Sequence, residues 1–125
     1  MRSFYVAGLL LLVPAAASAQ LMNAETFHQR ATALQKKGMM AIFSGGEIKT
    51  LTSEAQAAGK RAAEMRRASV KAGQQPRFCP PAGGVSIGDK EFMTRLSAIP
   101  AADRSRIDMT EAMTRILAAK FPCRG

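Results

Sequence analysis

Apolar residues recur every three or four positions along much of this chain, which is the spacing of one face of an α-helix. The longest series follows Ser44, and Glu47 three residues later completes the pattern of a capping box. This series predicts one long helix over residues 44–72, in which Gly59 marks a bend or a close helix contact. Its buried face is expected to hold Ile48, Leu51, Ala55, Ala58, Ala62 and Met65.

Three shorter helices are predicted around this long one. The first begins with a cap at Asn23 or Thr26 and ends at Gly38. The other two begin at Ser86 and near Ser105, each with an aspartate three positions later as its capping partner. The inward residues of the three helices are expected to be Phe27, Ala31, Leu34, Ile87, Phe92, Leu96, Ile99, Ile107, Met113, Ile116, Leu117 and Phe121.

The segments between these helices read as connections. "MMAIFSGG", residues 39–46, is a short apolar connection into a turn, and "GQQPRFCPPAGGV", residues 73–85, cannot be helical because of its prolines and glycines. Pro100 is expected to interrupt the third helix. No segment shows a convincing strand pattern. We therefore predict an all-α domain of the four-helix bundle type.

The first 19 residues are typical of an export signal. Arg2 provides the positive start, residues 6–13 a short apolar run, and Ala17 and Ala19 the small residues before a cleavage site. The apolar run is shorter than the roughly 20 residues that a membrane-spanning helix needs. We expect cleavage after Ala19, a periplasmic location, and a single helical domain over residues 20–125.

Export changes the interpretation of the two cysteines, Cys79 and Cys123. In an oxidising compartment, two cysteines in a small domain most simply form one disulfide. A closed loop of this length contributes roughly 4 kcal/mol in the loop-entropy estimate. Zinc would need four ligands, and His28 is the one histidine available to join them. Covalent haem would need a Cys-x-x-Cys-His motif, which the sequence lacks, so we expect no cofactor.

Catalytic groups are sparse in this sequence, and we predict that the protein is not an enzyme. No nucleophile can be assigned to His28, which reads as a surface or capping residue. Three carboxylates lie at predicted helix starts, where capping accounts for them, and two more lie among basic residues as solvated ion pairs. The first group is Glu47, Asp89 and Asp108, and the second is Glu54 and Glu64.

The chain is strongly basic, with a formal net charge of +9. The cations gather in the second half of the long helix and in the connector after it, where Glu64 offsets them. Such a cluster is either a solvated face or a surface for an acidic partner or an anionic envelope surface. Nucleic acid is not expected, because the protein is exported and no aromatic residues are interleaved for base stacking. The candidate partner-binding residues are Lys60, Arg61, Arg66, Arg67, Lys71 and Arg77.

The motifs around the cysteines resemble those of a known family. "FCPP" at residues 78–81, a helix, a proline break at Pro100 and a last helix "AMTRILAAKFPC" ending at Cys123 resemble the C-terminal half of the Rap/Tai family of type VI secretion immunity proteins. The resemblance covers about 45 residues. The N-terminal half lacks the further cysteines and the Gly-Tyr helix that are usual in this family.

This resemblance implies a function. Such proteins are small exported helical proteins that neutralise peptidoglycan amidase effectors, so the resemblance implies a protein that blocks such an effector by occlusion. It also implies a homodimer, although no heptad seam demands one. The alternative from the sequence is a structural or envelope-associated basic helical protein without a toxin partner.

Overall fold

The computed structural model describes residues 21–124, so the predicted export signal and the cleavage after Ala19 lie outside the described residues. In this part of the chain the secondary structure is helical, apart from an isolated β-bridge between Asn23 and Asp108. The all-α class is therefore confirmed. The elements are α1 (Ala24–Lys37), the 3-10 helix η1 (Gly38–Ser44), α2 (Gly45–Lys71), α3 (Asp89–Ala98), the short α4 (Ala101–Arg104) and α5 (Met109–Lys120).

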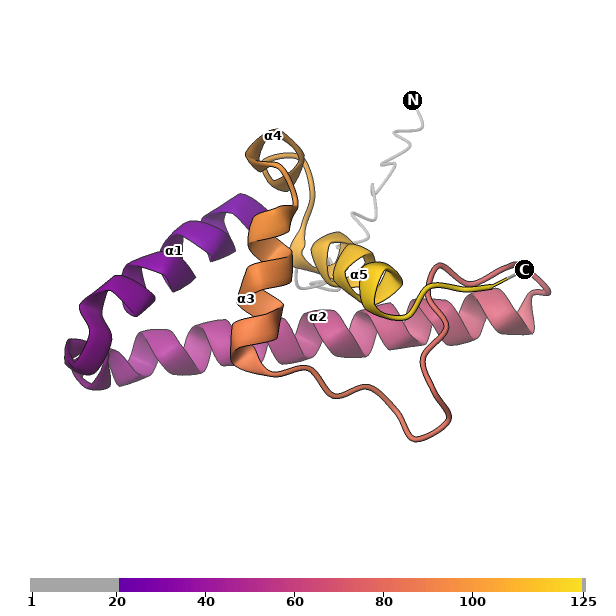
Figure 1. Cartoon of the computed structure of the whole chain (residues 1–125), viewed down its shortest axis with the longest axis horizontal. Helices are drawn as coiled ribbons and strands as arrows, with labels where there is room; N and C mark the ends of the chain where they lie inside the picture. Colours follow the sequence, from indigo (N-terminus) through magenta and orange to yellow (C-terminus); the bar gives the residue numbers. More distant parts are fainter. Residues whose placement is uncertain (1–20, 125) are drawn as a thin grey trace, which may run out of the picture.

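The long helix α2 is the base on which the other helices are arranged (Figure 1). α5 makes the most extensive contact with it. α1 and α2 form a hairpin whose far end is η1, and α3 stands across α2 rather than along it (Figure 1). A four-helix bundle with helices side by side is therefore not confirmed.

The core lies where α5 packs on α2 and where α1 and α3 pack against α5 and against each other. Leu96, Met109 and Ile116 are the largest fully buried side chains. The rings of Phe27 and Phe92 meet edge to face with centroids 5.7 Å apart, which joins α1 to α3. The other buried apolar residues are Leu21, Ala24, Ala31, Leu51, Ala58, Ala62, Phe78, Ile99, Ala112, Met113 and Leu117.

Backbone hydrogen bonds tie the start of α1 to the start of α5. The amide of Ala24 donates to the carbonyl of Ile107, and the amide of Met109 donates to the carbonyl of Met22, both at 2.9 Å. The side chain of Asn23 accepts hydrogen bonds from the backbone amides of Glu25 and Thr26, which confirms Asn23 as the cap of α1. This pairing brings together two segments that lie far apart in the sequence.

The predicted capping box at Ser44 is wrong. Ser44 precedes α2, but its side chain makes no capping hydrogen bond and instead accepts one from Nζ of Lys37. The reason is that the chain passes directly from η1 into α2, so Ser44 lacks the extended backbone that a capping side chain needs. Glu47 is free of the capping role and pairs with Arg30.

The two later capping boxes are also wrong. α3 begins at Asp89 after Gly88, while the carbonyl of Ser86 accepts a hydrogen bond from Nζ of Lys120, so residue 86 lies before the helix. Pro100 follows the end of α3 as predicted, but it is also the N-cap of the short α4, which was not predicted. α5 begins later than expected, because Asp108 is itself the cap and accepts the amide of Glu111 at 2.9 Å.

The buried face of α2 is shorter than predicted. Ile48 and Met65 are 41% and 56% exposed, so neither belongs to the buried face, which holds Leu51, Ala58 and Ala62. Gly59 does not mark a close helix contact, since a Cβ added there would have no neighbour within 4 Å. The core contact of α2 is thus confined to its middle.

Arg104, at the end of α4, is a buried cation. Its guanidinium donates to the carboxylate of Glu25 at 2.6 Å and to the carbonyls of Ser97 and Ile99. The hydrogen bond from Arg104 holds the pKa of Glu25 below its usual value. A cation out of water needs such partners, and here they join α1, α3 and α4.

Candidate functional site

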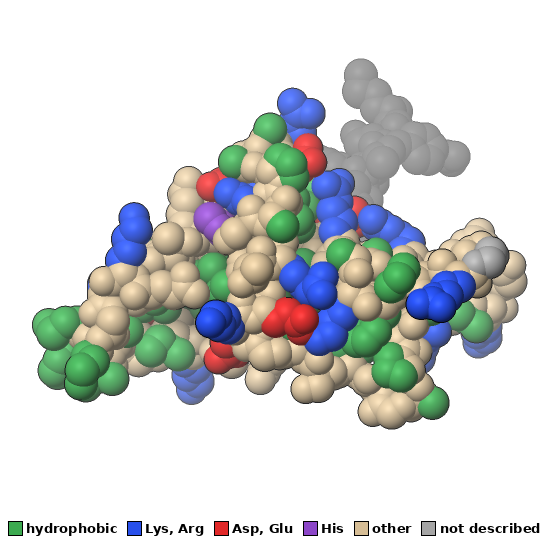
Figure 2. Space-filling view, viewed as in Figure 1, with side chains coloured by type: hydrophobic (Ala, Val, Ile, Leu, Met, Phe, Trp, Pro, Cys, Tyr) green, Lys and Arg blue, Asp and Glu red, His purple; other side chains and the backbone are tan. Residues whose placement is uncertain are grey.

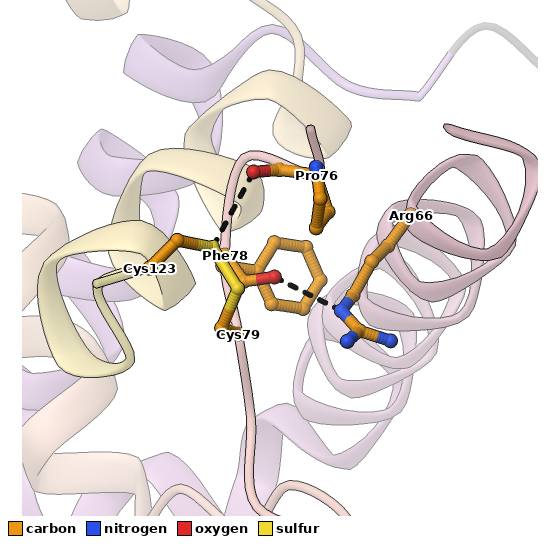
Figure 3. The surroundings of a disulfide bond; sticks show 5 residues. All are labelled: Arg66, Pro76, Phe78, Cys79 and Cys123. Atoms are coloured by element: carbon orange, nitrogen blue, oxygen red, sulfur yellow. Dashed lines mark hydrogen bonds between the residues drawn. A yellow bond between two sulfur atoms is a disulfide. The ribbon is translucent and has the colours of Figure 1, made fainter. Parts of the chain in front are cut away.

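The predicted disulfide is present between Cys79 and Cys123 (Figure 3). Their Cα atoms lie 4.9 Å apart, and the amide of Cys79 also donates to the carbonyl of Phe121 at 2.8 Å. The bond therefore joins the connector after α2 to the chain directly after α5. It encloses α3, α4 and α5 in one covalent loop.

Phe78 and Arg66 anchor the same connector to α2. The ring of Phe78 is buried, and Figure 3 shows Arg66 reaching from α2 toward it. Nε of Arg66 donates to the carbonyl of Phe78 at 2.9 Å, and the guanidinium carbon lies 5.9 Å from the ring centroid. Arg66 thus has a structural role in addition to its charge.

A second member of the predicted basic cluster is also held in a structural ion pair. Arg77 donates two hydrogen bonds to the carboxylate of Glu111, at 2.5 and 2.8 Å. This contact from Arg77 holds the pKa of Glu111 below its usual value. The pair joins the connector to α5 a few residues away from the disulfide.

The rest of the cluster is divided between different sides of α2. Lys60 and Arg67 lie seven positions apart, about two helical turns, and line the same groove. Arg61 lies on another side, in a hollow shared with Asp108 at the start of α5. Lys71 is exposed at the end of α2. The structure therefore brings together Lys60, Arg66 and Arg67, but not all six residues.

This groove has a volume of about 820 Å³. The middle of α2 forms one side of it and the connector from Phe78 to Asp89 the other. The sequence does not predict this groove, because it depends on how the connector is held to α2 by Arg66 and to the chain after α5 by Cys123. Its apolar floor consists of Phe27, Leu51, Phe78, Phe92, Met113 and Leu117.

A second feature lies at the far end of the α1–α2 hairpin. Met39, Met40, Ile42 and Phe43 on η1, here called the apolar tip, are 89%, 63%, 73% and 79% exposed. Figure 2 shows apolar side chains gathered at this end of the molecule. The apolar run was predicted to be a connection into a turn, and the structure forms it as the exposed 3-10 helix η1. Four large apolar residues within a short turn between two helices were the available signal.

The histidine has a partner that the sequence did not suggest. Nε2 of His28 lies 3.0 Å from the hydroxyl oxygen of Ser97, which joins α1 to α3. Burial and the charge of Arg104 lower the pKa of His28, so its neutral form is favoured. In catalytic pairs of serine and histidine, a third group usually orients the histidine. Here the nearby carboxylate of Glu25 is bonded to Arg104 and not to His28.

The carboxylates serve structural roles in most of the predicted positions. Glu47 pairs with Arg30 at 2.6 Å, and this contact lowers the pKa of Glu47. Glu54 accepts the backbone amide of Met22 at 3.1 Å. Within residues 21–124 no group of three or more histidine, cysteine or acidic side chains is arranged to hold a metal ion.

Comparisons with known proteins do not place this chain in a family. No protein-family model, no curated protein and no solved structure matches it. No helix formed by the described residues is long and apolar enough to cross a membrane. The candidate sites are therefore defined by their own geometry, as an apolar tip and a groove with a cationic rim.

Proposed function

We propose that this chain is a periplasmic protein-binding protein of the type VI immunity kind, which blocks a cell-wall amidase effector by occlusion. The observation that carries this proposal is the apolar tip, whose four large side chains are 63% to 89% exposed. Isolated exposed apolar residues are common on protein surfaces, but a gathered group of them is typical of an interaction site. The "FCPP" and "FPC" resemblance supports the choice of partner.

The shape and charge of this region suit insertion into a cleft. The tip lies at the end of two helices, so it protrudes from the body of the molecule (Figure 1). Lys36, Lys37 and Lys49 flank it and are exposed. Apolar side chains would supply the binding free energy in a desolvated centre, and the lysines would complement an acidic rim around the partner's active site.

A pair of matched substitutions tests the role of the tip. In the Phe43→Asp variant, a charge replaces a 79% exposed apolar residue of the tip, and the Val70→Asp control makes the same change at a 51% exposed residue of α2. Binding to a peptidoglycan amidase effector is measured by calorimetry, and inhibition of the effector by the release of peptide from cell walls. We expect roughly a thirtyfold loss or more for Phe43→Asp and little loss for Val70→Asp. Equal binding by both variants contradicts the proposal.

The second candidate function is attachment to an anionic envelope surface. Apolar side chains flanked by lysines are also the composition that interfacial membrane-binding segments use. Sedimentation with vesicles of phosphatidylglycerol and of phosphatidylcholine separates the two functions. Strong, salt-sensitive binding to the anionic vesicles, without retention of an amidase, favours the envelope role.

A further inference from the structure

The groove has a lining that differs from the rest of the surface. Its floor is apolar and aromatic, and the charged residues Lys60, Arg66, Arg67 and Asp89 lie among its lining. Three positive charges therefore oppose one negative charge around an apolar hollow. Its volume of about 820 Å³ lies within the range of about 300 to 1,000 Å³ that is usual for small-molecule sites.

The middle of α2 makes room for a ligand. Gly59 and Ala63 both line the groove, four positions apart, so they lie on the same face of the helix as Lys60 and Arg67. A Cβ at Gly59 would have no neighbour within 4 Å, which shows that this stretch of the groove is open. A narrow apolar occupant can thus pass along α2 directly beneath the two cations.

A second copy of the chain is a poor occupant on grounds of charge. The apolar tip would be the complementary shape, but Lys36, Lys37 and Lys49 beside it would approach Lys60 and Arg67 beside the groove. Like charges brought together at an interface are unfavourable. The positive rim instead favours an occupant that is apolar along most of its length and negative at one end.

We propose that the groove binds a single long acyl chain with an anionic head group, such as a free fatty acid. The chain would lie on the floor between Phe27 and Phe92 on one side and Phe78 on the other, and its carboxylate would face Lys60 and Arg67. This site is distinct from the apolar tip, so the inference goes beyond the proposed protein-binding function. It uses no residue that the proposed function requires.

The disulfide contributes to this site through the wall of the groove. Phe78, Pro80, Val85 and Ile87 form the side opposite α2, and all belong to the connector that Cys79 fastens to Cys123. Val85 is 43% exposed and forms part of the outer edge. Affinity for the acyl chain should therefore fall when the disulfide is reduced, because one wall is then no longer held.

The test uses a dansyl-labelled fatty acid, whose fluorescence rises in an apolar site, and the dansyl group is excited directly at a wavelength that tryptophan does not absorb. We expect saturable binding at one site per chain, displaced by oleate but at least tenfold less well by monoolein, which has the same chain and no charge. Gly59→Trp fills the groove and should weaken binding more than tenfold. Met65→Trp, on the same helix but in a different hollow, is the matched control and should bind as the original protein does.

A second variant keeps the test independent of any folding defect. Lys60→Glu combined with Arg67→Glu changes exposed residues only and should weaken oleate binding roughly tenfold at low salt, while monoolein binding stays the same. Circular dichroism verifies that each variant is folded. Equal displacement by monoolein, undiminished binding by Gly59→Trp, or displacement by an acidic amphipathic peptide but not by oleate would each overturn the proposal.

Discussion

The C-terminal helix α5 and the 3-10 helix η1 are both rich in apolar residues, but those of α5 are largely buried and those of η1 are exposed. α5 has seven buried residues, makes the most extensive contact with α2 and is followed closely by Cys123 of the disulfide. η1 has no buried residue, and its four large apolar side chains face outward. The difference indicates that stability is concentrated around α5, which leaves η1 available for contact with another molecule.

The largest effect is expected when the disulfide is removed. The double variant Cys79→Ser, Cys123→Ser should lose about 4 kcal/mol of unfolding free energy, because the unfolded chain is no longer constrained by a closed loop. Urea unfolding monitored by circular dichroism measures the loss. Reduction of the original protein is the control and should lower the midpoint to the same extent. If the double variant is as stable as the oxidised protein, stability is not concentrated around α5 and its disulfide.

A core substitution compared with a tip substitution sharpens the contrast. Leu96 is fully buried, so Leu96→Ala should cost about 3 kcal/mol through lost apolar contact and the cavity left behind. Phe43→Ala in η1 removes a larger side chain but should change stability by less than about 0.5 kcal/mol. Denaturant midpoints give both values. A large cost at Phe43 would show that the apolar tip is packed rather than exposed.

Gly59 offers a smaller effect of opposite sign. Gly59→Ala should stabilise the protein by about 0.5 to 1 kcal/mol, because alanine restricts the unfolded chain and the added methyl group meets no neighbour. Thermal unfolding checks this. The matched change at Gly73, whose φ is +74°, should instead destabilise, since alanine is strained in that conformation. A loss of stability at Gly59 would mean that the groove is closed there.

Acid is expected to have the smallest effect on stability at any single ion pair. It should destabilise both the region near η1 and the region near α5. Arg30 near η1 and Arg77 near α5 lower the pKa of Glu47 and Glu111 below the ordinary value of 4.5. Their contribution is therefore complete above that value and is lost as the pH falls through the lowered pKa values. Glu111→Gln should flatten the decline of stability between pH 5 and acid, measured by urea unfolding at about five pH values. An unchanged slope would show that Glu111 is not held by Arg77.

The sequence predicted the features that depend on local spacing. Residues 44–72 were expected to be one helix, and α2 covers Gly45–Lys71. The Cys79–Cys123 pair was also predicted and found. Serine caps failed at all three positions, because whether a serine caps a helix depends on the backbone before it, as the passage from η1 into α2 shows at Ser44.

The candidate sites could be predicted from the sequence less well than the helices. The basic residues from Lys60 to Arg77 are close in sequence, but the helix and the partners Phe78 and Glu111 give them separate roles. The groove exists because a connector without regular structure is fastened over α2 and α5 by a distant cysteine. Periodicity does not show whether an apolar run such as η1 is buried or exposed. It also does not predict a hollow of this kind.

The covalent link between Cys79 and Cys123 has a consequence for digestion by proteases. Residues 79–123 form a ring, and residues 81–86 within it are exposed. One peptide bond hydrolysed in this stretch would leave both fragments joined through sulfur. A nicked molecule would therefore migrate as two pieces on a denaturing gel only after thiol treatment, and the helices on either side of the nick would stay attached to each other.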